Sequence, residues 1–182
     1  MSIVITGSPG VGKHTIADKI SKQFDLSIID INSIAKEEGL FEKNNGINDV
    51  DTTKLGKLLG EKIFEKVVIV GHLAPYVLEK DQVKKIIILR RDPYELIPVY
   101  QERKYKEDKI KENTGSEILG IIAHDTKTKF QEKSFQINTS GKSIQEVVEK
   151  VATIISNNNG NEEVDWLDLV TKNNDLKKFF GD

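Results

Sequence analysis

A glycine-rich turn directly after the first apolar run constrains the fold of this chain more than any other feature. Residues 7–15 read GSPGVGKHT and follow the apolar residues 3–5. Glycines in such a turn let successive backbone N–H groups point at one anion, and the lysine adds a positive charge for phosphate oxygens. The next residues, 13–24, are apolar at helical spacing. A strand, a phosphate-binding loop and a helix in this order predict an α/β fold that binds a nucleoside triphosphate.

The loop supplies most of the predicted ATP contacts. They are Gly7, Pro9, Gly10, Val11, Gly12, Lys13, His14 and Thr15. Lys13 is also a predicted catalytic residue, because its charge can stabilise the β- and γ-phosphates. His14 stands where Ser or Thr usually follows the lysine, so Thr15 is the nearest hydroxyl that can contact Mg²⁺, the predicted cofactor of ATP.

Length and composition favour one domain and exclude several classes of site. A chain of 182 residues with 37% hydrophobic content can bury one core with small insertions. The net charge of −2 gives no general electrostatic reason to expect nucleic-acid binding. The absence of cysteine excludes disulfides, zinc–thiolate sites and thiol catalysis. No apolar stretch approaches membrane-spanning length, so we expect no membrane partner and a cytoplasmic protein.

Apolar runs and helical patterns alternate along the chain. Strands are expected at residues 2–6, 26–31, 67–70, 86–89 and 135–138, and helices at 13–24, 51–64, 93–104, 116–130 and 143–155. Short β-branched runs suit buried parallel strands, and the last helix opens with the capping-box spelling Ser143-x-x-Glu146. The alternation predicts right-handed crossovers and a ligand crevice at the carboxyl ends of the strands, where the loop lies.

After the main domain the sequence becomes polar and then amphipathic. We place the main domain at residues 1–156, followed by a polar linker, SNNNGNEE, and an amphipathic C-terminal helix within residues 157–182. The apolar side chains of this helix are Val164, Trp166, Leu167, Leu169, Val170, Leu176, Phe179 and Phe180. They are expected to dock on the body of the protein or to bind a partner.

Cationic residues near the expected crevice are candidates for phosphoryl transfer. Only Arg90, Arg91 and Arg103 of the 27 basic residues are arginine. Arg90 follows the fourth strand and is expected to reach a phosphate, whereas Arg91 is expected at the surface. Arg103 begins a highly charged stretch that looks like a flap, and with Lys109 it is expected to close over the transferred group.

Titratable residues at two other strand ends complete the candidate site. His72 follows the third strand and either positions a water or an acceptor oxygen, or is a hydrogen-bonded structural histidine. Asp30 ends the second strand and is a candidate for the Mg²⁺ shell, and Asp51 is a candidate for the monophosphate site.

These motifs resemble those of a known family. GSPGVGKHT is similar to the GxPGxGKxT loop of adenylate kinases, and residues 29–36 resemble the start of their monophosphate-binding region, with Lys36 where they carry an arginine for AMP. His72 matches the acidic-x-His signature of the adenylate kinase isoenzyme 6 group, although Val70 replaces its acidic member. Residues 102–105, 109–113 and 164–166 resemble the lid and tail of that group.

The resemblance implies a fold and an activity. The fold is a P-loop NTPase three-layer sandwich with a five-stranded parallel sheet, a monophosphate-binding insertion near residues 32–64 and a lid near 103–113. The implied reaction converts ATP and AMP into two ADP, with ATP hydrolysis besides. The catalytic residues would be Lys13, His72 and Arg103, and the monophosphate contacts Asp30, Lys36, Asp51 and Arg90.

Two other functions stay open. The resemblance also implies an ATPase assembly factor that binds a ribosomal protein during maturation of the small ribosomal subunit. The third possibility is a nucleotide-binding module with little catalysis, which Val70 makes conceivable. Turnover of ATP with and without AMP would separate the three.

Overall fold

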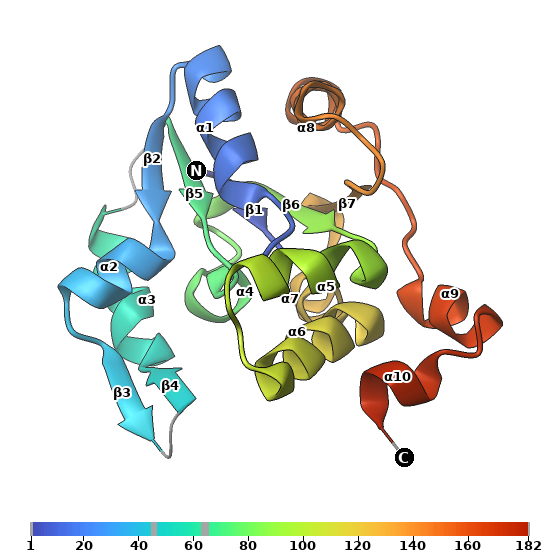
Figure 1. Cartoon of the computed structure of the whole chain (residues 1–182). Helices are drawn as coiled ribbons and strands as arrows, with labels where there is room; N and C mark the ends of the chain where they lie inside the picture. Colours follow the sequence, from blue (N-terminus) through green and yellow to red (C-terminus); the bar gives the residue numbers. More distant parts are fainter. Residues whose placement is uncertain (1, 45–46, 63–65, 182) are drawn as a thin grey trace.

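A five-stranded parallel sheet lies at the centre of the molecule. The computed structural model describes residues 2–44, 47–62 and 66–181. In spatial order the strands are β2 (Ser27–Asp30), β5 (Val67–Val70), β1 (Ser2–Thr6), β6 (Val83–Arg90) and β7 (Ser134–Asn138) (Figure 1). All the pairings between them are parallel. The predicted sheet is confirmed, and every predicted strand overlaps an observed one.

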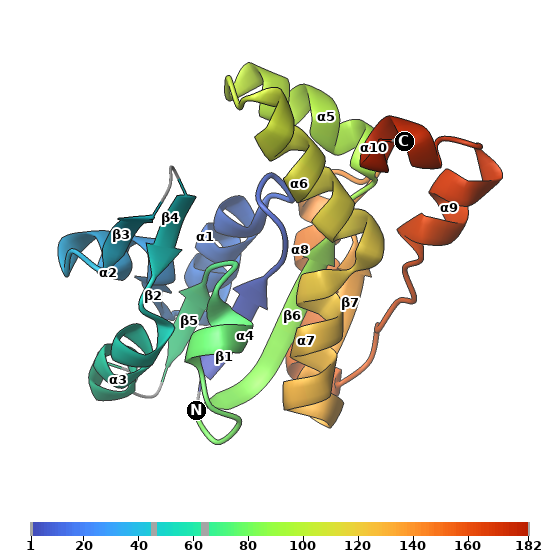
Figure 2. The same ribbon diagram turned by 90° about the horizontal axis from the view of Figure 1, so that it is seen from below.

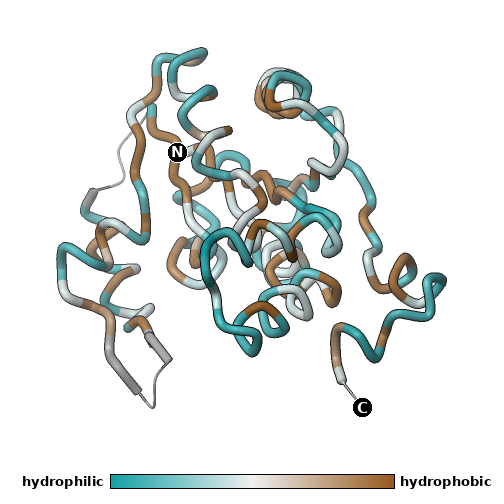
Figure 3. Tube along the Cα trace, viewed as in Figure 1, coloured by the Kyte–Doolittle hydropathy of each residue, from teal (hydrophilic) through white to brown (hydrophobic). Residues whose placement is uncertain are grey.

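Helices cover both faces of the sheet. One face carries α1 (Lys13–Phe24) and α8 (Ile144–Asn157), and the other carries α2 (Ile31–Glu37), α3 (Thr52–Lys62), α4 (Ala74–Val77) and α7 (Ile121–Phe130). The alternation of side chains in β1 shows the division, because Ile3 and Ile5 pack in the first apolar cluster and Val4 in the second. The central strands are correspondingly apolar (Figure 3). The three-layer sandwich is confirmed.

An insertion separates β2 from β5. It consists of α2, the antiparallel hairpin β3 (Phe41–Asn44) and β4 (Ile47–Val50), and α3. It lies at the β2 edge of the sheet, on the opposite side from the C-terminal helices (Figure 2). The helix expected at residues 51–64 is found as α3. Residues 45–46 and 63–64 of the expected insertion lie outside the described part of the chain, as do the chain ends at 1 and 182.

The single helix expected at residues 116–130 is wrong. It is two helices, α6 (Glu107–Leu119) and α7, because Gly120 has a φ of 65° and ends α6. Within the stretch expected as a lid, residues 103–106 connect α5 (Pro93–Glu102) to α6, and residues 107–113 begin α6. Glu107 and Asp108 lie in the first turn of α6, where negative charge favours helix formation.

The C-terminal segment docks on α5 and α6. In place of one amphipathic helix it forms α9 (Trp166–Lys172) and α10 (Leu176–Phe180), since the chain turns at Asn174 with a φ of 57°. Trp166, Val170 and Phe179 are buried with Ile118 of α6. No helix in the described part of the chain is both long and apolar enough to cross a membrane.

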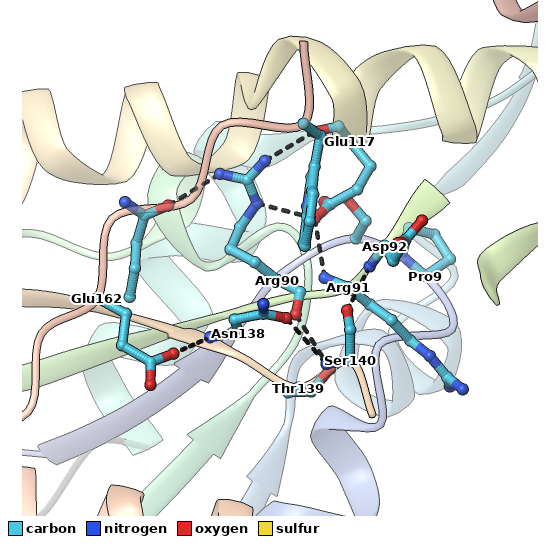
Figure 4. A network of polar contacts seen from close by, with 12 residues as sticks. Pro9, Arg90, Arg91, Asp92, Glu117, Asn138, Thr139, Ser140 and Glu162 are labelled. Carbon is cyan, nitrogen blue, oxygen red and sulfur yellow. Dashed lines mark hydrogen bonds and ion pairs between the residues drawn. The ribbon is translucent and has the colours of Figure 1, made fainter. Parts of the chain in front are cut away.

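The polar linker packs against the sheet. The side-chain carbonyl of Asn161 accepts the N–H of Gln136 at 2.8 Å, and the Glu162 carboxylate accepts that of Asn138 at 2.6 Å (Figure 4). Both bonds occupy the outer edge of β7. The linker therefore covers a sheet edge that would otherwise expose unpaired backbone groups.

Candidate active site

The phosphate-binding loop is shaped by the strand beside it. Gly7 has a φ of 136°, and a Cβ atom there would overlap with the carbonyl oxygen of Leu89 in β6. Only glycine fits this position. Gly12 has a φ of 92° and precedes α1 without a side-chain cap, so the first N–H groups of the helix stay available to a ligand.

Three side chains hold the loop from behind. The Tyr100 hydroxyl donates to the carbonyl of Pro9 at 2.6 Å, and Arg91 donates to that of Gly10 at 3.4 Å. The Ser8 hydroxyl donates to Glu117 at 2.5 Å. Because the carbonyl and N–H of a peptide point in opposite directions, fixing these carbonyls outward directs the N–H groups toward the nucleotide side.

Lys13 is buried at the start of α1. Its ammonium donates to the carbonyl of Ser8 at 3.1 Å, and the residue is 4% exposed. Burial, and then the positive charge of Arg103, lower the pKa of Lys13 to about 8. A phosphate anion beside this ammonium would compensate both effects, so the site favours a strongly negative ligand.

A cavity of 530 Å³ lies in front of the loop and collects most of the predicted site. Its wall includes Lys13, Thr15, His72, Arg103 and Lys109. These residues come from α1, from the segment after β5, from the connection between α5 and α6, and from α6 itself. Tyr105 also lines the cavity and stacks on Tyr100, with ring centroids 5.6 Å apart, and Lys109 lies 4.4 Å from its ring centre. The three predicted catalytic residues thus share one cavity.

His72 is a neutral imidazole in this cavity. Burial lowers its pKa to about 4, and the positive charge of Lys13 contributes to the shift. At neutral pH its ring therefore keeps one free lone pair and one N–H. Such a group can accept a hydrogen bond from an acceptor or a water, or donate one to it, without adding charge to the cavity.

Two buried polar atoms in the cavity wall lack a hydrogen-bond partner within the described part of the chain. They are Oδ1 of Asn32, in α2, and Nδ2 of Asn113, in α6. Buried polar groups are nearly always paired in folded proteins, so an acceptor and a donor left over on one cavity indicate a polar ligand. Neither residue was a predicted site residue, because no motif marks their convergence.

Asp30 lies near the position where the acidic residue is replaced. The register of β2 and β5 pairs Asp30 with Val70. Its carboxylate caps α2 by accepting the N–H groups of Asn32 and Ser33, and it lies 2.9 Å from Nε2 of His14. The strand next to Val70 therefore carries an acidic residue, Asp30, at the matching position of the register.

A second cavity of 440 Å³ shares part of its lining with the first. Gly12 and Thr15 line both, and Arg91, Thr139 and Lys142 are among the other lining residues of the second. Arg91 was expected at the surface, but it pairs with Glu95 at 3.0 Å and contacts the loop. The sequence hides this cavity because the segment after β7 carries no recognisable motif.

Three predicted monophosphate contacts lie elsewhere. Lys36 and Asp51 are exposed and line neither cavity, and Asp51 caps α3 through the N–H of Lys54. Arg90 is 3% exposed, and its guanidinium donates to Glu117 and Gln136 at 2.7–2.8 Å (Figure 4). We therefore correct the assignment of Arg90 to a structural role, since its donors are used inside the protein.

Relatives of the chain identify its family. A family model described as "AAA domain" matches residues 3–120. A Methanosarcina barkeri protein named "Putative adenylate kinase" is 33% identical, and the match covers 93% of this chain and 100% of the relative. A Sulfurisphaera tokodaii protein of the same name is 34% identical over 93% of this chain and 87% of the relative. The chain belongs to the adenylate kinase family. It is a phosphotransferase built on a P-loop.

Solved structures show the same fold at lower identity. Shikimate kinase from Aquifex aeolicus is 20% identical, with a TM-score of 0.56 over 87% of this chain and 98% of the other. The YorR protein of Bacillus subtilis, solved in complex with phosphorylated GDP, is 17% identical, with a TM-score of 0.63 over 90% of this chain and 100% of the other. This member of the adenylate kinase family therefore has the P-loop kinase architecture expected from its loop.

Proposed function

We propose that the protein is a nucleoside monophosphate kinase that transfers the γ-phosphoryl group of ATP to AMP and releases two ADP. One observation carries the proposal. The cavity that contains Lys13, His72 and Arg103 continues to Asn32 and to Tyr76, on the side of the insertion and α7. A single space therefore joins a phosphate-binding loop to a wall where a second nucleotide would lie.

The donor nucleotide would lie across the loop. Its phosphates would contact the loop N–H groups and Lys13, and its base would enter the second cavity beside Thr139 and Lys142. Thr15, which lines both cavities, would hold Mg²⁺ together with phosphate oxygens, and Asp30, whose charge acts on Lys13, would orient the water shell of the ion. Bound Mg²⁺ would neutralise charge on the β- and γ-phosphates.

The acceptor would lie between the insertion and α7. The Tyr76 hydroxyl donates to Asp125 at 2.7 Å, which holds its ring against the cavity, and Ile121 and Ile122 add apolar surface for a base. The free acceptor atom of Asn32 suits a hydroxyl or amino group of that nucleotide.

Transfer itself needs positive charge and alignment more than covalent chemistry. An oxygen of the acceptor phosphate forms the new bond to the γ-phosphorus while the bond to the β–γ bridging oxygen breaks. Lys13, Arg103 and Lys109 would stabilise charge on the transferred group, and Asn113 would donate its unpaired N–H to one of its oxygens. His72 would orient the acceptor or, in its absence, a water.

ATP hydrolysis is the second candidate activity. The segment after β5, residues 71–77, contains no lysine or arginine that could bind the phosphate of a monophosphate, and Lys36 does not line the cavity. Weak monophosphate binding would leave room for water as the acceptor. A ribosomal-protein partner and a cytoplasmic location stay predictions from the sequence.

Turnover assays test the proposal. The purified protein should form ADP from ATP and AMP with Mg²⁺ faster than it releases phosphate from ATP alone. Lys13→Ala should lower both rates by roughly 100-fold or more at an unchanged melting temperature, because it removes charge stabilisation from the transition state. Hydrolysis that AMP does not redirect would support the ATPase instead. Absence of both activities in a protein that binds ATP would contradict both candidates.

A further inference from the structure

A single buried carboxylate, that of Glu117, joins the phosphate-binding loop to the C-terminal segment. The residue is 2% exposed. Its Oε2 accepts the Ser8 hydroxyl at 2.5 Å, and its Oε1 accepts Nε of Arg90 at 2.8 Å and the indole N–H of Trp166 at 3.1 Å (Figure 4). Four donors hold the group, since the backbone N–H of Arg91 also reaches Oε1 at 3.1 Å.

One side of this link ends at Lys13. The Ser8 hydroxyl donates a hydrogen bond to Glu117, and the Ser8 carbonyl accepts one from the Lys13 ammonium at 3.1 Å. The ammonium is therefore two hydrogen bonds away from the carboxylate. A change in the position of Glu117 moves Ser8, and with it the group that fixes Lys13 before a nucleotide binds.

The other side of the link depends on the docked tail. Trp166 is the first residue of α9 and packs against Ile118 and Val170. The tail is fastened again beyond it, where Tyr94 of α5 donates to Asp175 at 2.7 Å and meets Phe179 edge-on at 5.2 Å between ring centres. The indole N–H reaches Glu117 only while this segment is in place.

We infer that Trp166, held in place by the docked C-terminal segment, and Glu117 are positioning residues for Ser8 and Lys13 of the phosphate-binding loop. This rests on the proposed function and adds a requirement to it. A buried carboxylate that loses one of its donors shifts toward the others, because an unsatisfied lone pair in the interior is costly. Loss of the indole N–H therefore changes how tightly Glu117 holds the loop.

A double-mutant cycle between Ser8→Ala and Trp166→Phe tests the link. Trp166→Phe keeps an aromatic ring and removes the N–H, and it should weaken ATP binding about five-fold, the scale of one hydrogen bond. In the Ser8→Ala background the same substitution should change ATP affinity by less than about two-fold, because the connection is already cut. Calorimetric ATP affinity and the split between kcat and KM are measured beside the melting temperature.

The neighbouring Leu167→Ala is the matched control, since Leu167 is 41% exposed on the same helix and should change neither ATP affinity nor kcat. Additive effects of the two substitutions, or native ATP affinity in Trp166→Phe, would overturn the inference. If Trp166→Phe fails to fold, Glu117→Asp tests the same link, because it draws the carboxylate back from Ser8 and keeps a charge for Arg90. Native ATP affinity in folded Glu117→Asp would also overturn it. ATP affinity needs no turnover, so the result is independent of whether AMP is the acceptor.

Discussion

The positive charge of Lys13 is unfavourable in the free protein, because the ammonium is buried and lies near Arg103. Bound phosphates would stabilise it. Burial and Arg103 bring its pKa to about 8, and phosphates in the loop would raise it again. The free protein therefore takes up a proton on binding ATP when the pH lies above about 8. We expect ATP affinity to fall as pH rises through that range, with a buffer-dependent binding enthalpy in calorimetry. Unchanged affinity with no proton uptake would show that Lys13 is not the titrating contact.

His72→Ala separates a functional from a structural histidine. Because His72 is uncharged at neutral pH, its removal leaves the charge of the cavity unchanged. If it orients the acceptor, transfer to AMP or ATP hydrolysis should fall by roughly 100-fold, the size of a general acid–base effect, while ATP affinity and the melting temperature stay native. A lower melting temperature with native rates would assign it a structural role. Native behaviour in all three measurements would contradict both.

Sequence patterns located the site residues that lie in one motif or directly after a strand, and missed those that only the tertiary fold brings together. The loop spelling placed Lys13 and Thr15, and the rule that ligands bind at the carboxyl ends of parallel strands placed His72 beside them. The same rule failed for Arg90, because it locates a residue at the sheet edge but does not give its side-chain direction. Asn32 and Asn113 were missed since their meeting depends on how the insertion and α6 fold over the sheet.

The junction of α5 and α6 supplies two cations that line the cavity beside the loop. Arg103 is the C-cap residue of α5 and Lys109 lies in the first turn of α6, so these helices position both cations. Arg103→Ala should reduce kcat more than it reduces ATP affinity, by roughly 10- to 100-fold, since the contact is needed most in the transition state. Steady-state kinetics with a direct ATP-binding measurement check this. Lost ATP affinity at native kcat would instead place Arg103 on the ground-state nucleotide.

Long apolar elements were predictable and short polar ones were not. The strands and α1 have continuous or periodic apolar residues, and the capping box of Ser143 and Glu146 is found at the start of α8. The hairpin β3–β4 and helix α2 are short, and tertiary contacts decide them. The break at Gly120 was missed because the apolar pattern continues through it into α7.

The buried pair of Arg90 and Glu117 connects β6, α6 and β7 into one unit. Both side chains are under 5% exposed, and Gln136 of β7 accepts a third bond from Arg90. Arg90→Ala should lower the free energy of unfolding by about 3–5 kcal/mol, because it leaves a buried carboxylate without its cation. Urea denaturation followed by circular dichroism measures this, and Lys22→Ala, which removes an exposed ion pair with Asp18, is the control. A loss no larger than in the control would mean that the pair does not hold the layers together.

The contact between Gly7 and Leu89 shows that the loop motif contains residues required by the fold as well as residues required by the ligand. Gly7 is required because β6 passes directly behind it, whereas Lys13 is required only if phosphate is bound. A descendant of this chain that stopped binding nucleotides would be free to lose the lysine but would keep the first glycine for as long as it kept the sheet. Within this architecture, the glycine therefore indicates that a chain has kept the fold, and the lysine indicates that it still binds phosphate.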